Sequence, residues 1–136
     1  MRDAAWQVQL SLYNALVANA ELVDLAPGGI YDHVPGSNES SYPRVTLGDD
    51  TLLDWDTDTS FGADMTCTIH VWSTEAGRKE AKVILAKIAE ILHEQDLTID
   101  GFDLVYMRRE FEEVLTLQDG ATRHGIARYR IVVQER

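Results

Sequence analysis

Apolar and polar residues alternate strictly along the stretch Met65-Thr66-Cys67-Thr68-Ile69-His70-Val71-Trp72. Successive side chains of a β-strand point to opposite faces of a sheet, so this period of two predicts a strand with one buried face. The apolar set consists of the odd-numbered residues from Met65 to Val71. We therefore expect these residues to face a core, while Trp72 lies on the opposite parity.

The residues before this strand carry a second alternating pattern, which begins at Arg44. Five residues share one parity of it: Val45, Leu47, Thr51, Leu53 and Trp55. The polar residues 56–64 that follow are typical of a turn region. We expect a long hairpin made of these two strands, with its first strand half-buried and bent at Gly48.

Two other segments have the period of an amphipathic helix. Residues 75–94 follow the capping residues Ser73 and Thr74, and their apolar stripe is Ala81, Ile84, Leu85, Ile88, Ile91 and Leu92. Residues 4–20 follow Asp3, another capping residue, and their stripe is Trp6, Leu10, Tyr13, Leu16, Val17 and Ala20. Each stripe is expected to pack on the sheet.

The C-terminal part of the chain has the pattern of a second hairpin. Strands are expected from Phe102 to Leu117 and from Gly125 to Gln134, joined by a turn at Asp119-Gly120. A short edge strand is expected at residues 30–34. The order of elements predicts one domain, residues 1–136, of the α+β class: a two-layer structure whose antiparallel sheet has four to five strands and two helices packed on one face.

The composition is that of a folded, acidic protein. The 136 residues are 45% hydrophobic and 26% charged, and 23 Asp and Glu against 12 Lys and Arg give a net charge of −11. This charge repels phosphate, which disfavours general binding to nucleic acid and to anionic membranes. No apolar run approaches the roughly 20 residues that span a bilayer, and the N-terminus has no apolar signal core, so a cytoplasmic origin is expected.

The segment Phe102-Asp103-Leu104-Val105-Tyr106-Met107 is apolar on both parities. A two-layer domain has one core-facing sheet surface, so apolar residues on the other face need a cover, which another subunit would supply. The arginines of the last two strands are expected to form a cross-strand ladder with nearby glutamates, which would set the register of such an interface. The candidate interface residues are Trp72, Leu104, Tyr106, Arg108, Glu110, Arg128 and Arg130.

The first hairpin has an acidic tip. Its sequence Asp54-Trp55-Asp56-Thr57-Asp58 resembles the start of a calcium loop, but Thr59 and Met65 stand where that loop needs Gly and Glu, so the pattern fails. We expect a solvated element that repels DNA or meets a basic partner. Its carboxylates are Asp49, Asp50, Asp54, Asp56, Asp58 and Asp64.

No catalytic motif is recognisable in the chain. The four histidines lack the spacing of metal ligands on one helix, Cys67 lies on the buried parity of a strand, and no nucleophile elbow or phosphate-binding loop occurs. We therefore expect no metal, no cofactor and no enzymatic activity. The alternative is a small α+β enzyme or ligand-binding module with a pocket between sheet and helices.

Three segments together carry a resemblance to a known family. They are residues 30–35 (Ile-Tyr-Asp-His-Val-Pro), residues 42–48 (Tyr-Pro-Arg-Val-Thr-Leu-Gly) and residues 71–82, which begin Val-Trp-Ser-Thr-Glu-Ala and run into Ile88 and Leu92-His93. By their order and spacing, the chain over about residues 5–134 resembles the tail-completion or tail-terminator family of tailed bacteriophages, which is also found in gene transfer agents.

The resemblance implies a structural α+β subunit that closes into a ring, typically a hexamer. Such a ring caps the tail tube protein, meets the head-side stopper or connector, and lets DNA pass through its lumen as non-specific cargo. The interface residues would then lie between subunits, and the acidic hairpin would face the lumen or a partner ring. No cofactor, catalysis or membrane is implied. A head-proximal stopper or a tube-like protein is the structural alternative.

The resemblance also implies where the protein resides. It would be part of the tail–head junction of a virion or gene transfer agent particle that is assembled in the bacterial cytoplasm.

Overall fold

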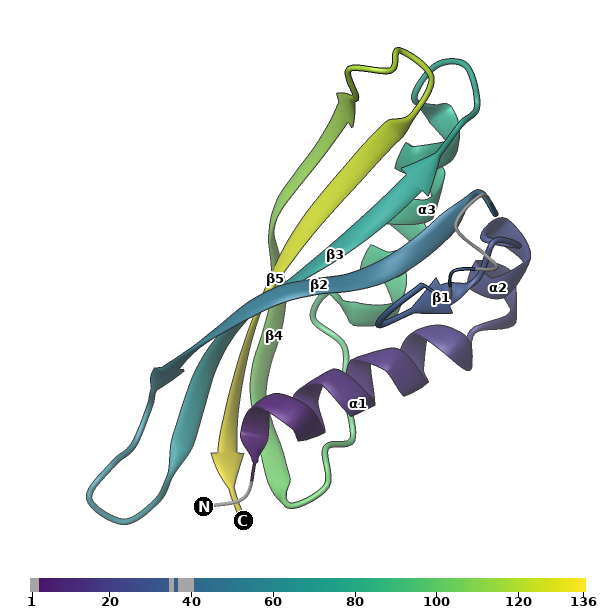
Figure 1. Cartoon of the computed structure of the whole chain (residues 1–136). Helices are drawn as coiled ribbons and strands as arrows, with labels where there is room; N and C mark the ends of the chain where they lie inside the picture. The colour runs from purple at the N-terminus through teal and green to yellow at the C-terminus, as the bar shows by residue number, and fades with distance from the viewer. Residues whose placement is uncertain (1–2, 35, 37–40) are drawn as a thin grey trace.

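The computed structural model describes residues 3–34, 36 and 41–136. Its elements in chain order are α1 (Ala4–Val17), α2 (Ala20–Leu25), β1 (Ile30–Tyr31), β2 (Arg44–Asp54), β3 (Gly62–Ser73), α3 (Lys79–Leu92), β4 (Phe102–Thr116) and β5 (Arg123–Glu135). The helices lie on one side of a strongly twisted sheet, and the β2–β3 hairpin extends beyond them at one end (Figure 1).

The strands form one sheet of five strands in the order β1-β2-β3-β5-β4, which confirms the α+β class. The pairs β2–β3, β3–β5 and β4–β5 are antiparallel. β1 instead pairs parallel to β2, so the sheet is mixed and not wholly antiparallel as predicted. The segment before β1 explains this, because Gly28 N–H donates to the Pro43 carbonyl at 2.8 Å and Val45 N–H donates to the Gly29 carbonyl at 2.9 Å.

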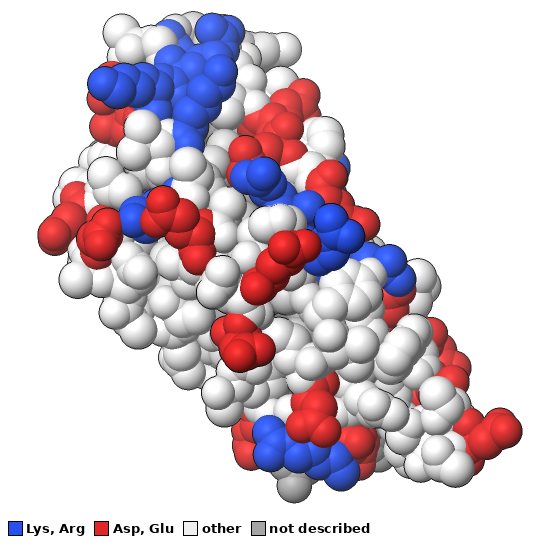
Figure 2. Space-filling model, turned by 180° about the vertical axis from the view of Figure 1, so that it is seen from behind, with Lys and Arg blue, Asp and Glu red and all other residues white. Residues whose placement is uncertain are grey.

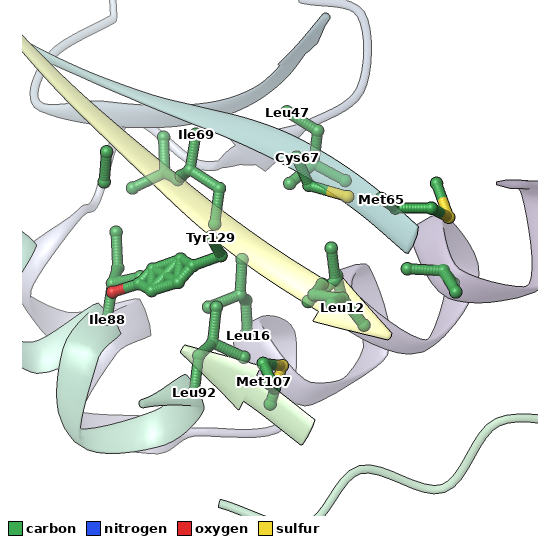
Figure 3. Close-up of a cluster of buried hydrophobic side chains, with 14 of the residues drawn as sticks. Leu12, Leu16, Leu47, Met65, Cys67, Ile69, Ile88, Leu92, Met107 and Tyr129 are labelled. Carbon is green, nitrogen blue, oxygen red and sulfur yellow. The ribbon is translucent and has the colours of Figure 1, made fainter. Parts of the chain in front are cut away.

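The core lies between the sheet and the helices. Tyr129 of β5 is fully buried there, with Leu16 of α1, Ile88 of α3 and Ile69 of β3 among its apolar neighbours in the cluster (Figure 3). The predicted stripe of α3 is confirmed, since Ala81, Ile84, Leu85, Ile88 and Leu92 are buried and Ile91 is partly buried. The predicted alternation of β3 is also confirmed, with Met65, Cys67, Ile69 and Val71 buried.

The predicted stripe of α1 is confirmed at Leu16, which is buried, and at Tyr13, which is partly buried against the core, but not at its other residues. The buried residues of the helix are Ala4, Val8, Leu12 and Leu16. Trp6, Leu10 and Val17 are exposed instead. The helix is apolar on two neighbouring faces, and the face with the smaller side chains at i,i+4 spacing allows closer packing on the sheet. The helix also ends at Val17, three residues earlier than predicted, and a short helix α2 follows.

The starts of the helices test the predicted caps. The Asp3 carboxylate accepts a hydrogen bond from Trp6 N–H at 3.2 Å, which confirms this cap. α3 begins only at Lys79, so Ser73 and Thr74 do not cap it. Ser73 is buried, and its hydroxyl donates to Glu80 at 2.7 Å, so it ties the end of β3 to the first turn of α3.

β2 bends where Gly48 predicts. Its pairing with β3 shifts from Leu47 opposite Ile69 to Asp50 opposite Cys67, which leaves one extra residue in β2. Such a β-bulge inverts the alternation of the strand beyond it. Thr51 and Leu53 therefore lie on the face opposite to Val45 and Leu47, and the prediction that these residues share a face is wrong.

Candidate functional site

The face of the sheet that carries no helix is the candidate functional site, and we call it the open face. On β3 its side chains are Asp64, Thr66, Thr68, His70 and Trp72, and on β5 they are His124, Ile126, Arg128, Arg130 and Val132. On β4 they are Tyr106, Arg108, Phe111, Glu113 and Leu115. Since the core cluster takes the alternate side chains of these strands, the open face is available for contacts outside the subunit.

Two β-bulges in β4 decide which of its side chains reach the open face. The pairing of β4 with β5 shifts at Val105 and again at Glu110. Leu104 lies opposite Val133 and packs partly against the core, whereas Tyr106 lies opposite Val132 on the open face. Leu104 and Tyr106, which the sequence places on one face, are therefore on opposite faces.

An ion pair and a cation–π contact connect three strands on the open face. Arg130 donates from Nε and Nη2 to the two carboxylate oxygens of Asp64, at 2.9 and 2.7 Å. The same guanidinium lies 5.2 Å from the centre of the Tyr106 ring. The hydrogen bonds from Arg130 hold the pKa of Asp64 below its ordinary value. Asp64 is thus tied into the sheet, apart from the acidic tip with which the sequence groups it.

The predicted ladder of ion pairs between β4 and β5 is not found among the ion pairs of the described residues. Arg108 pairs with Glu94 at 3.6 Å, and Arg109 pairs with Glu112 of its own strand at 3.0 Å. Glu110 is an exposed bulge residue. The register explains this outcome, because the β4 bulge at Glu110 shifts the glutamates away from the arginines of β5.

Arg128 has a different contact from the predicted one. Its guanidinium lies 4.8 Å over the centre of the Phe111 ring. It forms no ion pair with any residue of the part of the chain that the structure describes. A guanidinium that lies on an aromatic ring and has no carboxylate partner can still form an ion pair with a carboxylate of another molecule.

Three aromatic rings stack at the other end of the open face. The ring centres of Trp72 and His124 are 3.9 Å apart and nearly parallel, and Trp72 Nε1 donates to Thr46 Oγ1 at 3.0 Å. His70 Nδ1 and His124 Nε2 share a hydrogen bond of 2.7 Å. Burial and the nearby His70 lower the pKa of His124 to about 4, so its ring is neutral at pH 7. Partners within the chain thus leave Trp72 only partly exposed.

Several exposed apolar side chains around the open face are not among those predicted. Phe111 and Leu115 of β4 are 38% and 39% exposed, and Leu53 and Phe61 at the β2–β3 hairpin are 65% and 53% exposed. Their exposure is not evident from the alternation in the sequence, because each follows or flanks a bulge or turn that breaks it. One signal was available: Phe111 is an isolated aromatic residue in the charged run from Arg108 to Glu113.

The carboxylates at the tip of the β2–β3 hairpin shape its turn. Asp54 accepts a hydrogen bond from Asp56 N–H, and Asp56 accepts one from Gly62 N–H, both at 2.9 Å. Asp49, Asp50 and Asp58 are exposed. Acidic side chains are visible around this tip, at the lower right of Figure 2, whereas basic side chains gather at the opposite end of the molecule.

Other features bear on chemistry and location. Within residues 3–34, 36 and 41–136, no three His, Cys, Asp or Glu side chains are grouped as metal ligands would be. Burial raises the pKa of the Cys67 thiol to about 12, with a further contribution from Asp50, so this thiol stays protonated at pH 7. Among the described residues, no helix has the length and apolar character needed to span a membrane.

Known proteins are similar to the chain in both sequence and fold. The family described as "Tail completion protein gp17" matches residues 11–134. The chain is 34% identical over 99 residues to the tail completion protein gp17 of Bacillus phage SPP1, which covers 73% of this chain and 72% of that protein.

Two solved structures extend the comparison to three dimensions. A chain in the virion of a native gene transfer agent particle superposes with a TM-score of 0.90 and 25% identity, covering 98% of this chain and 99% of that one. The structure of the SPP1 gp17 protein superposes with a TM-score of 0.64 and 29% identity, covering 94% and 89% of the two chains. The chain therefore belongs to the tail completion protein gp17 family.

Proposed function

We propose that this chain is the tail completion protein of a phage-like particle: a structural terminator that caps the tail tube and joins it to the head-side connector. The observation that carries the proposal is the match to a chain of a gene transfer agent virion, with a TM-score of 0.90 over 98% of this chain and 99% of that one. The family consists of structural proteins, so the role is in assembly and not in catalysis. The protein then resides in the particle, at the junction of tail and head.

The proposal includes self-association into a closed ring, a hexamer, with DNA passing through the lumen. The open face supports this part, since Phe111 and Leu115 remain exposed in the single chain. A ring of identical subunits needs two different complementary surfaces that close by rotation. The net charge supports the passage of DNA, because each copy adds a charge of −11 and phosphate is repelled from such a ring.

Electron microscopy of particles that lack this chain tests the proposal. We expect tail tubes of uncontrolled length, or tails that are not attached to heads. Particles with normal attached tails would show that the protein has another role. The position of its density in complete particles separates a terminator, which lies directly on the last ring of the tube, from a head-proximal stopper or a tube protein. Native mass spectrometry of the purified chain gives the number of subunits in the ring.

A further inference from the structure

The loop end of the β2–β3 hairpin, residues 49–61, is a second uncovered surface, and we call it the arm. Four large apolar side chains lie on it: Leu52, Leu53, Trp55 and Phe61, which are 42%, 65%, 37% and 53% exposed. None of them belongs to the core cluster or packs against it. Several exposed apolar residues on one projecting element are typical of a surface that contacts another molecule.

The arm also has a strongly one-sided charge. It carries the five aspartates at positions 49, 50, 54, 56 and 58 and contains no Lys or Arg. Asp58 is exposed, and no ion pair of the described residues includes it. A surface that covers the arm must therefore offer both apolar area and positive charge.

The open face offers both. Phe111 and Leu115 supply exposed apolar area, and Arg128 lies over Phe111 without an ion-pair partner among the described residues. Aromatic side chains and arginines are the residue types that contribute most to binding at protein interfaces. The arm and the open face are thus complementary in both hydrophobicity and charge.

We propose that the arm of one copy docks on the open face of a second copy, with Leu53 and Phe61 of the arm against Phe111 and the arm carboxylates near Arg128. The inference rests on the proposed function, because it requires self-association. The arm cannot fold back onto Phe111 and Arg128 of its own chain, since it continues β2 and β3, which stay paired as far as Asp54 and Ala63.

A contact of this kind has a direct consequence for assembly. It joins two different surfaces, so each added copy leaves one free arm and one free face. These free surfaces disappear only when the last arm meets the first face, which is the condition for a closed ring. The rotation between successive copies at this contact therefore determines whether they close into a ring.

Photo-crosslinking of the full-length chain tests the proposed contact. A photoreactive phenylalanine derivative replaces Phe61, and isotopically labelled and unlabelled chains are mixed before irradiation, so that crosslinks between copies are recognised by mass. We expect crosslinks from the arm to peptides of β4 and β5 of another copy. The same derivative at Val23 of α2, which is 44% exposed, is the matched control and should give none to these strands. Crosslinks that reach only other parts of the second copy, or no crosslinks between copies, would overturn the inference.

Charge exchange provides a second, independent test. We expect Arg128→Glu or Asp58→Arg alone to weaken self-association at least tenfold, and the two together to restore most of it. Lys82→Glu, on the exposed side of α3, is the control with the same charge change as Arg128→Glu and should have little effect. Unchanged self-association in Arg128→Glu, or no recovery in the combination, contradicts the proposed contact.

The two proposals fail in different ways. If the arm crosslinks elsewhere while particles lacking the chain still have defective tails, the docking contact is overturned and the tail completion role stands. If particles lacking the chain have normal tails, the tail completion role itself is overturned.

Discussion

The two faces of the sheet belong to the same strands, but they are built by different interactions. On the helix-covered face, Ile69, Tyr129 and Ile131 are fully buried in one cluster with α1 and α3. On the open face, neighbouring residues are joined by the Asp64–Arg130 ion pair, by cation–π contacts and by stacked rings. Side chains such as Phe111 stay partly exposed there.

This difference separates the stability of the subunit from its association. Burying one large apolar side chain contributes about 1.5–3 kcal/mol, whereas a solvent-exposed ion pair contributes roughly 0–1 kcal/mol. The helix-covered face therefore provides most of the free energy of folding. The open face can be substituted at little cost to the fold, which makes the comparison testable.

The largest effect on unfolding is expected from the helix-covered face. Leu85 of α3 is 1% exposed, so Leu85→Ala leaves a cavity and should lower the free energy of unfolding by about 2–5 kcal/mol. Val83→Ala, at a 40% exposed position of the same helix, should cost less than about 0.5 kcal/mol. Chemical denaturation measures both. Equal losses of unfolding free energy in the two variants would mean that the buried side of α3 contributes no more to stability than its exposed side.

The next effect concerns association rather than folding. Phe111→Asp places a charge in the exposed apolar part of the open face and should weaken self-association at least tenfold, while the free energy of unfolding changes by less than about 1 kcal/mol. Val23→Asp on α2 is the matched control, at 44% exposure. Sedimentation velocity compares the variants. The open face is not an interface if Phe111→Asp associates as the wild type does.

The ion pair on the open face should have a smaller effect. We expect Asp64→Asn to lower the free energy of unfolding at pH 7 by about 1 kcal/mol, because Arg130 stays partly exposed and solvent screens the pair. The folded pKa of Asp64 lies below its ordinary value of 3.8, so its contribution is present above pH 3.8 and is lost as the pH falls through the folded pKa. The wild type and the variant should therefore converge in acid. A constant difference down to low pH contradicts this assignment.

The stacked histidines predict a modest pH dependence. The folded pKa of His124 is about 4 and its ordinary value is 6.5, so the unfolded chain binds more protons between these values and stability rises with pH across that range. His124→Gln should make this rise shallower. Thermal unfolding at several pH values measures the slope, and an unchanged slope would show that His124 titrates normally in the folded chain.

The smallest effect on unfolding is expected at the tip of the arm. Asp56→Asn combined with Asp58→Asn should change the free energy of unfolding by less than about 0.5 kcal/mol, because both side chains are exposed and an asparagine oxygen can still accept from Gly62 N–H. Denaturation of the variant checks this. A loss above about 1 kcal/mol would mean that the tip packs within its own subunit and not against another copy.

The sequence alone predicted the parts of the molecule whose pattern is unbroken. The alternation of β3 and the stripe of α3 identified their buried residues correctly, because each element has one apolar face and no insertion. The resemblance carried by residues 30–35, 42–48 and 71–82 identified the family, which the comparisons confirm.

The errors in the facing of strand residues have a common physical origin. A β-bulge adds one residue and inverts the alternation beyond it, and no residue type marks its position as clearly as Gly48 does in β2. Because the bulges at Val105 and Glu110 cannot be located from the alternation, the prediction assigned Leu104 to the wrong face and did not assign Phe111 to the open face. α1 is apolar on two neighbouring faces. Tertiary packing decides which of the two is buried, and the periodicity of the sequence carries no information on this choice.

The bulge at Glu110 has an evolutionary consequence. Because Glu110 is the one extra residue between Arg109, opposite Tyr129, and Phe111, opposite Arg128, its loss in a homologue would leave the outer half of β4 in the same register and with the same side chains shown to a neighbour. The half of the strand that begins at Phe102 keeps its place in the subunit. A one-codon insertion or deletion at this bulge can thus occur in related chains without changing the side chains that one copy presents to the next.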